Sequence, residues 1–228
     1  MQLAWTQPCS SGKLLLWLAS TLLLWENVAS TPMCAMKKGH CFVTLAELCD
    51  RAVNVTQHIS SQAAGMFSEF DAQYAHGRGR LGGLRMCHTS SLSTPENKKQ
   101  ALQTHPVDLL KLVASLSRAW SNPLYHLVNK MSTMRGAPTS VVHKAREIIE
   151  KIDGLLEGVH KMLYKVMSGY KQDDQYPAWF GLADLLSPNE EKCILACYKL
   201  IRCLRRDLKY VDTYFKVLKC RMFQGNKC

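Results

Sequence analysis

The sequence lacks the motifs on which enzymes most often depend. It contains no G-x-S-x-G nucleophile elbow, no H-E-x-x-H pair, no phosphate-binding glycine loop and no C-x-x-C. Its eight histidines are scattered along the chain rather than gathered into one segment. The sequence therefore predicts neither an enzyme nor a cofactor, and favours a protein that acts by binding.

Acidic residues are scarce beside basic ones: 18 Asp and Glu stand against 29 Lys and Arg, which gives a formal net charge of +11 at pH 7. Such a surplus fits a protein that meets acidic receptors, proteoglycans or anionic membranes. Nucleic acid is not indicated, because the sequence has no interleaved basic and aromatic repeats, no RNP-like strand and no zinc-finger spacing.

Long hydrophobic stretches are confined to the first thirty residues. An apolar stretch runs from Lys13 to Trp25, which is shorter than the roughly 20 apolar residues of a membrane span but typical of a signal peptide. We predict that residues 1–30 are a signal peptide cleaved after Ser30, with an uncleaved membrane anchor as the alternative. Residues 31–228 then form one secreted, extracellular domain, large enough for a single sizeable core.

Four long segments carry apolar residues at alternating steps of three and four, which is typical of amphipathic helices. They run over residues 42–74, 106–134, 139–167 and 188–222. Only the link between the second and third is short, and a short link makes neighbouring helices antiparallel. We therefore predict an all-α, up-up-down-down four-helix bundle of the long-chain cytokine type, with two long crossover loops. Pro123 lies within the second segment and is expected to kink or break it.

Cysteine spacing is the most specific signal. Two of six cysteines, Cys34 and Cys41, flank a short loop before the first helix. Cys87 lies in the first long link, Cys203 lies in the fourth helix, and Cys220 and Cys228 lie in the tail. Further motifs are M-F-S-E-F-D from Met66, S-L-S-T-P-E from Ser91, W-S-N-P-L-Y-H-L-V from Trp120, L-L-E-G from Leu155 and C-L-R-R-D from Cys203. In these features the chain resembles the prolactin and growth hormone family, and especially its placental members, the placental lactogens and proliferins.

The resemblance implies three disulfides, Cys34–Cys41, Cys87–Cys203 and Cys220–Cys228. It also implies a hormone that binds a class I cytokine receptor, either the prolactin receptor or a relative. If the chain follows the placental members, the hormone is of placental origin. Such hormones bring two receptor chains together through two surfaces.

Three cysteines are left over: Cys49, Cys193 and Cys197. In the predicted topology Cys49 lies at the opposite end of the bundle from the other two. Cys193 and Cys197 lie four apart on one helix, where their Cβ atoms are farther apart than a disulfide prefers. Buried thiols are the first interpretation, and an interchain disulfide at Cys193 is the alternative.

The resemblance places the first receptor surface on the outer faces of the first and fourth helices and on the first link. The residues that match it are Gln57, Ser60, Arg205, Arg206, Lys209, Tyr210 and Tyr214. The second surface surrounds a small residue of the third helix, which Gly158 matches. A mid-helix glycine costs roughly 1 kcal/mol against alanine, so close approach of a receptor side chain is one reason to keep it.

The first surface departs from the prolactin pattern. Gln57 and Ser60 stand where prolactin typically has two histidines, and Lys209-Tyr210 stands where the family usually has His-Lys. The sequence therefore predicts no zinc bridge and no metal site. This departure from the prolactin pattern leaves open the alternative that the partner is a receptor other than the prolactin receptor.

Asn54-Val55-Thr56 is the only N-x-[ST] sequon. Asn54 lies three residues before Gln57 and so on the same predicted helix face. A glycan at Asn54 is expected at the edge of the first surface.

The fourth helix also carries a basic face, formed by Arg202, Arg205, Arg206, Lys209, Lys216 and Lys219. This face can be a solvated surface, a complement to an acidic receptor loop, or a binding site for heparan sulfate. The sequence leaves these interpretations open.

Overall fold

The structure is a computed structural model that describes residues 35–37, 40–74, 86–172, 175–223 and 228. The predicted signal peptide, 1–30, lies outside the described residues. By its internal contacts the chain divides into two compact units, residues 1–43 and 44–228.

The first unit contains a short antiparallel ladder. Strand β1 (Ala35–Lys37) pairs with strand β2 (His40–Phe42), and Met36 lies opposite Cys41. The sequence pattern predicts no strand here and begins a helix at residue 42, which is wrong, since Phe42 ends β2.

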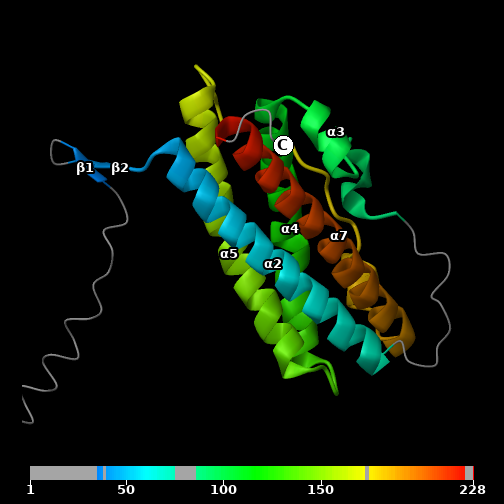
Figure 1. The fold of residues 1–228 in the computed structure, drawn as a ribbon. Helices are drawn as coiled ribbons and strands as arrows, with labels where there is room; N and C mark the ends of the chain where they lie inside the picture. The colour runs from blue at the N-terminus through cyan, green and yellow to red at the C-terminus, as the bar shows by residue number, and fades with distance from the viewer. Residues whose placement is uncertain (1–34, 38–39, 75–85, 173–174, 224–227) are drawn as a thin grey trace, which may run out of the picture. The chain divides into compact units, whose positions relative to one another are not determined.

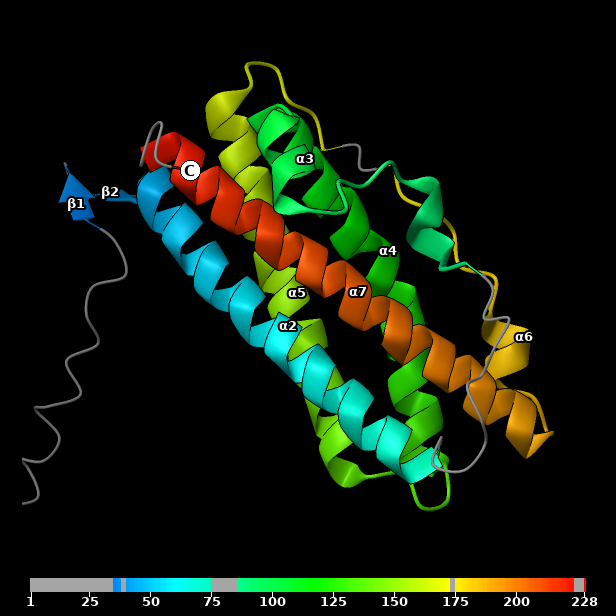
Figure 2. The same ribbon diagram turned by 45° about the vertical axis from the view of Figure 1, so that its right-hand side comes forward.

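The second unit is a bundle of four long helices (Figure 1). They are α2 (Leu45–Tyr74), α4 (Pro106–Thr133), α5 (Thr139–Val166) and α7 (Glu190–Phe223). Figure 2 shows α2 and α4 running in one direction and α5 and α7 in the other, and each of the first pair packs on both of the second. The predicted all-α, up-up-down-down bundle is confirmed.

The described parts of the crossovers contain three short helices that the sequence pattern does not reveal. The first crossover contains η1 (His88–Ser91) and α3 (Lys98–Gln103), and the second contains α6 (Leu182–Leu185). Each is too short for a helical periodicity to emerge. Helix α3 packs on α7, α6 packs on α4 and α7, and η1 forms hydrogen bonds to both long helices, so these segments are part of the folded surface.

The core is formed by the apolar stripes of the long helices. Its largest fully buried side chains include Trp120, Tyr214, Phe70 and Phe215. Full burial of a large apolar side chain contributes roughly 1.5–3 kcal/mol each, so these stripes supply the main stabilisation of the bundle.

The start of α2 is fixed by a capping box. The backbone N–H of Thr44 donates to Glu47 Oε2 at 2.8 Å, and the backbone N–H of Glu47 donates back to Thr44 Oγ1 at 3.1 Å. Two helix-terminal N–H groups are thereby satisfied. The same Thr44 contacts lower the pKa of the Glu47 carboxyl.

Thr44→Ala is expected to lower the free energy of unfolding by about 1 kcal/mol, because it removes the cap oxygen. Urea denaturation followed by circular dichroism measures the change. The control is Thr133→Ala near the end of α4, whose hydroxyl only donates to the Lys130 carbonyl. Equal losses in the two variants would contradict the capping assignment.

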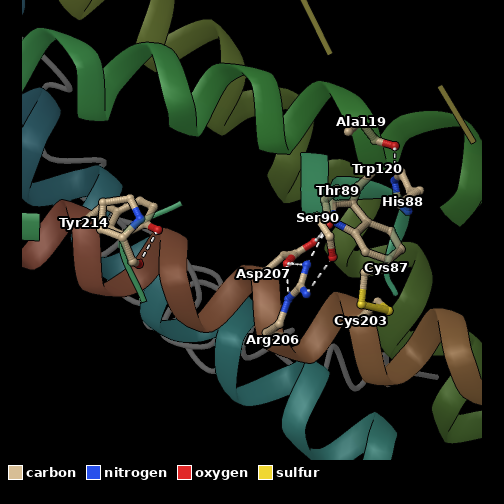
Figure 3. A network of polar contacts seen from close by, with 11 residues as sticks. Cys87, His88, Thr89, Ser90, Ala119, Trp120, Cys203, Arg206, Asp207 and Tyr214 are labelled. Carbon is tan, nitrogen blue, oxygen red and sulfur yellow. Dashed lines mark hydrogen bonds and ion pairs between the residues drawn. A yellow bond between two sulfur atoms is a disulfide. The ribbon is translucent and has the colours of Figure 1, made fainter. Parts of the chain in front are cut away.

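Pro123 does not break the second long helix, because α4 continues through it. Proline lacks the N–H that would bond the carbonyl four residues earlier, which belongs to Ala119. His88 Nε2 of the first crossover donates to that carbonyl at 3.1 Å (Figure 3). The predicted break is therefore wrong, because a residue from elsewhere in the chain replaces the missing hydrogen bond.

Candidate functional site

A surface groove of about 1110 Å³ lies between α2, α7 and the described part of the first crossover, residues 86–105. Ser60 of α2 lines it, together with Arg205, Arg206, Lys209 and Tyr210 of α7. Five of the seven residues predicted for the first surface therefore come together here. We call this feature the basic groove.

The other two predicted residues lie elsewhere. Gln57 is exposed on α2 but does not line the groove. Tyr214 is fully buried, and its hydroxyl donates to the Pro95 carbonyl at 2.6 Å. Its assignment to a contact surface is wrong, because the first crossover covers it. Burial raises the pKa of this phenol, and its role is to anchor the crossover.

Beneath the groove, Asp207 is the centre of a buried polar network (Figure 3). Its carboxylate accepts hydrogen bonds from Thr89 Oγ1 at 2.6 Å and Trp120 Nε1 at 3.0 Å. It also accepts from Arg206 Nε at 2.8 Å. With only 1% of its surface exposed, Asp207 is a charged group whose burial is balanced by three donors from three segments.

The same network holds Arg206 in place. Its terminal nitrogens donate to Thr89 Oγ1 at 2.8 Å and to Ser90 Oγ at 3.2 Å. One turn earlier, Cys203 forms a disulfide with Cys87, with their Cα atoms 5.7 Å apart. The first crossover is thus joined to α7 by a covalent bond and by charge-assisted hydrogen bonds.

Sequence reasoning did not identify Asp207, Thr89 or Trp120 as a unit. An aspartate on an amphipathic helix resembles a solvated residue, and its partners lie 118 and 87 positions away. One feature of the sequence could have indicated this network: all three residues lie within or beside the motifs that carry the family resemblance.

The groove carries five cationic side chains: Lys199, Arg202, Arg205, Arg206 and Lys209. The guanidinium of Arg205 lies 3.9 Å from the centroid of the Phe67 ring, a cation–π contact. Within the described residues, Lys199, Arg202 and Lys209 make no ion pair. The groove therefore presents uncompensated positive charge.

A second set of polar contacts runs between α2 and α5. His58 Nε2 lies 2.6 Å from Glu147 Oε1, and Gln62 Nε2 donates to Glu147 Oε2 at 3.1 Å. The contact with His58 lowers the pKa of the Glu147 carboxyl. His58 therefore has a carboxylate partner on α5.

Further along α5, Gly158 and Gly154 lie one turn apart. A Cβ atom added at either would meet no heavy atom of the described residues within 4 Å, apart from the adjacent backbone of α5 itself. Neither glycine is required by close packing within the chain, so the surface of α5 is open at this point.

The glycosylation sequon lies in the middle of α2. Asn54 is exposed, while Thr56 is fully buried and its hydroxyl donates to the Val53 carbonyl at 3.1 Å. Asn54 therefore faces solvent on the side of α2 away from the core.

Cys49, Cys193 and Cys197 are free and buried. Burial raises the pKa of the Cys49 thiol to about 11 and also raises that of Cys197. Cys193 has only 3% of its surface exposed, which contradicts the alternative of an interchain disulfide. The chain also forms the Cys220–Cys228 disulfide, whereas the predicted Cys34–Cys41 pair lies outside the described residues at Cys34.

His88 makes the first crossover sensitive to acid. Its ring packs edge-on against Trp120 with centroids 4.8 Å apart, and burial lowers its pKa from the usual 6.5. As the pH falls below about 6.5, the unfolded chain binds the proton before the folded chain does, so folding stability declines.

Between pH 7.5 and pH 5.0, the wild type is expected to lose more stability than His88→Gln. The glutamine amide has no titration in this range and can still donate to the Ala119 carbonyl. Urea denaturation at both pH values measures the difference. An equal loss in the two proteins would show that His88 does not contribute.

Among the described residues, no group of three or more His, Cys, Asp or Glu side chains is arranged so that it could hold a metal ion. No described helix has the length and apolar character needed to cross a membrane.

An antiparallel bundle with two long crossovers, one of them tied to the last helix, defines the class of long-chain helical hormones and cytokines. The family model described as the somatotropin hormone family matches residues 17–228. Prolactin-2A1 of Mus musculus is 45% identical, and Prolactin-2A1 of Rattus norvegicus 43% identical, each over the full length of both chains. The chain therefore belongs to the somatotropin hormone family and is a hormone of the prolactin type. Membership of a hormone family implies a receptor partner rather than catalysis.

Proposed function

We propose that the chain is a secreted prolactin-like hormone that binds and dimerises a class I cytokine receptor through two surfaces. The observation that carries this proposal is the basic groove, where α2, α7 and the first crossover meet. It gathers five predicted contact residues on a surface fixed by the Cys87–Cys203 disulfide and the Asp207 network. Rigid support of this kind lowers the ordering cost of binding.

The second receptor surface lies on α5 around Gly158. A side chain from a partner can approach the helix backbone closely there, because no side chain of the described residues stands within 4 Å of the missing Cβ. The first surface lies between α2 and α7, so the two surfaces use different sides of the bundle and one hormone can hold two receptors.

A glycan at Asn54 belongs to the same proposal. Asn54 is exposed, and its outward position on α2 accommodates a bulky sugar. Because Thr56 is buried, the sequon is available to the glycosylating enzyme only before α2 packs. The Cys34–Cys41 disulfide and the signal peptide are proposed on the family resemblance.

A second candidate is a prolactin-fold factor that acts through a different receptor or through heparan sulfate. Two observations favour it: the groove carries five cationic side chains, and Lys209 and Tyr210 stand where the family usually has His-Lys.

Growth of a prolactin-receptor-dependent cell line with purified protein tests the main proposal. We expect growth, and we expect the protein to compete with prolactin for the receptor. Failure in both assays would overturn prolactin-receptor binding and favour the second candidate.

A further inference from the structure

The cations of the basic groove form one stripe along α7. Lys199, Arg202, Arg206 and Lys209 follow one another at steps of three and four, so their side chains leave the same side of the helix. At a rise of 1.5 Å per residue the stripe is about 15 Å long. An extended, linear polyanion matches this shape better than a single anion does.

Charge within the groove is poorly neutralised by the chain itself. Among the described residues that line the groove, Glu96 is the only one with a carboxylate. Asp207 lies beneath the groove and its oxygens are already bonded to three donors. Lys199, Arg202 and Lys209 make no ion pair within the described residues, so an anionic ligand breaks no existing pair at these three positions.

The rest of the lining is hydroxyl-rich. The hydroxyl groups of Ser60, Ser90, Ser93, Thr94 and Thr213 line the groove, together with that of Tyr210. Hydroxyl donors and cations suit sulfate oxygens and sugar hydroxyls. The composition of the groove therefore fits a sulfated sugar chain.

We propose that the basic groove binds a sulfated glycosaminoglycan chain and that this chain and the receptor exclude each other there. Glycosaminoglycan binding, the binding half of this proposal, is argued from the groove alone. Mutual exclusion of the sugar chain and the receptor, the exclusion half, rests on the proposed function. A hormone held by matrix glycosaminoglycan through this groove has its first receptor surface covered. Release from the sugar chain then becomes a condition for signalling.

Calorimetric titration of the full protein with a heparin decasaccharide tests the binding half. Lys199→Gln/Arg202→Gln/Lys209→Gln is expected to raise Kd about tenfold or more. The matched control is Lys151→Gln/Lys165→Gln/Lys171→Gln, which removes the same charge from exposed lysines outside the groove. Equal rises in Kd for the two variants would overturn the groove as the site.

Two further titrations test the chemistry. Hyaluronan of the same length carries carboxylates without sulfates, and poly-glutamate carries carboxylates on a peptide. Both are expected to bind much more weakly than the heparin decasaccharide at 0.15 M salt, where long-range attraction between exposed charges is screened. Equal binding of poly-glutamate would overturn the sugar assignment in favour of an acidic protein segment.

Competition with immobilised receptor ectodomain tests the exclusion half. We expect the decasaccharide to displace the wild-type hormone, and a ternary complex would overturn exclusion while leaving the calorimetric result intact. Absence of receptor binding without heparin would instead contradict the proposed function, because the calorimetric titration contains no receptor.

Discussion

Replacing Asp207 with alanine is expected to lower the free energy of unfolding by about 3–5 kcal/mol, the usual cost of breaking a buried charge pair. The substitution removes the acceptor for Thr89 and Trp120 and leaves the Arg206 guanidinium without its carboxylate. Because Thr89 belongs to η1, the first crossover should loosen from α7 as well. Urea denaturation measures the loss, and Trp120, whose indole N–H loses its partner, supplies a fluorescence signal.

The matched control is Asp50→Ala on α2. Asp50 pairs with Lys219 at 2.8 Å, and both side chains are well exposed, at 55% and 39%; such pairs contribute about 0–1 kcal/mol. If Asp207→Ala lowered the free energy of unfolding no more than Asp50→Ala, the buried network would not be what holds the crossover.

Gly158→Arg is expected to remove the second receptor contact while leaving the first intact. A Cβ atom added at Gly158 meets open space, and replacing a mid-helix glycine stabilises the helix by up to about 1 kcal/mol, so the variant should fold normally. The arginine then occupies the space that the receptor needs. The concentration for half-maximal growth of receptor-dependent cells should rise about tenfold or more, because disrupting a central contact of a protein interface commonly costs that much affinity.

Gly158→Ala is the control for the helix effect, because it adds only a Cβ atom. It should be at least as stable as the wild type and retain most of its growth activity. Full activity of Gly158→Arg would contradict the placement of the second surface on α5.

The long helices could be predicted because their apolar stripes repeat over about thirty residues. Their ends depend on particular contacts instead. The cap formed by Thr44 and Glu47 begins α2 three residues after the predicted start. Pro123 is tolerated because His88, distant in sequence, supplies a donor to Ala119.

The candidate site was predicted in part, and its errors have one physical cause. A helical pattern shows which residues can face outward but not which of them a crossover covers. Tyr214 was assigned to the surface and is buried under Pro95. Asp207 resembles a solvated residue in the sequence and is buried by residues of η1 and α4.

The molar mass of the complex with soluble receptor ectodomain, measured by light scattering after size-exclusion chromatography, tests the central claim most directly. A hormone with two receptor surfaces should give a complex of one hormone and two ectodomains, and Gly158→Arg should give one of each. A wild-type complex limited to one ectodomain at saturating receptor, or no complex at all, would contradict the claim.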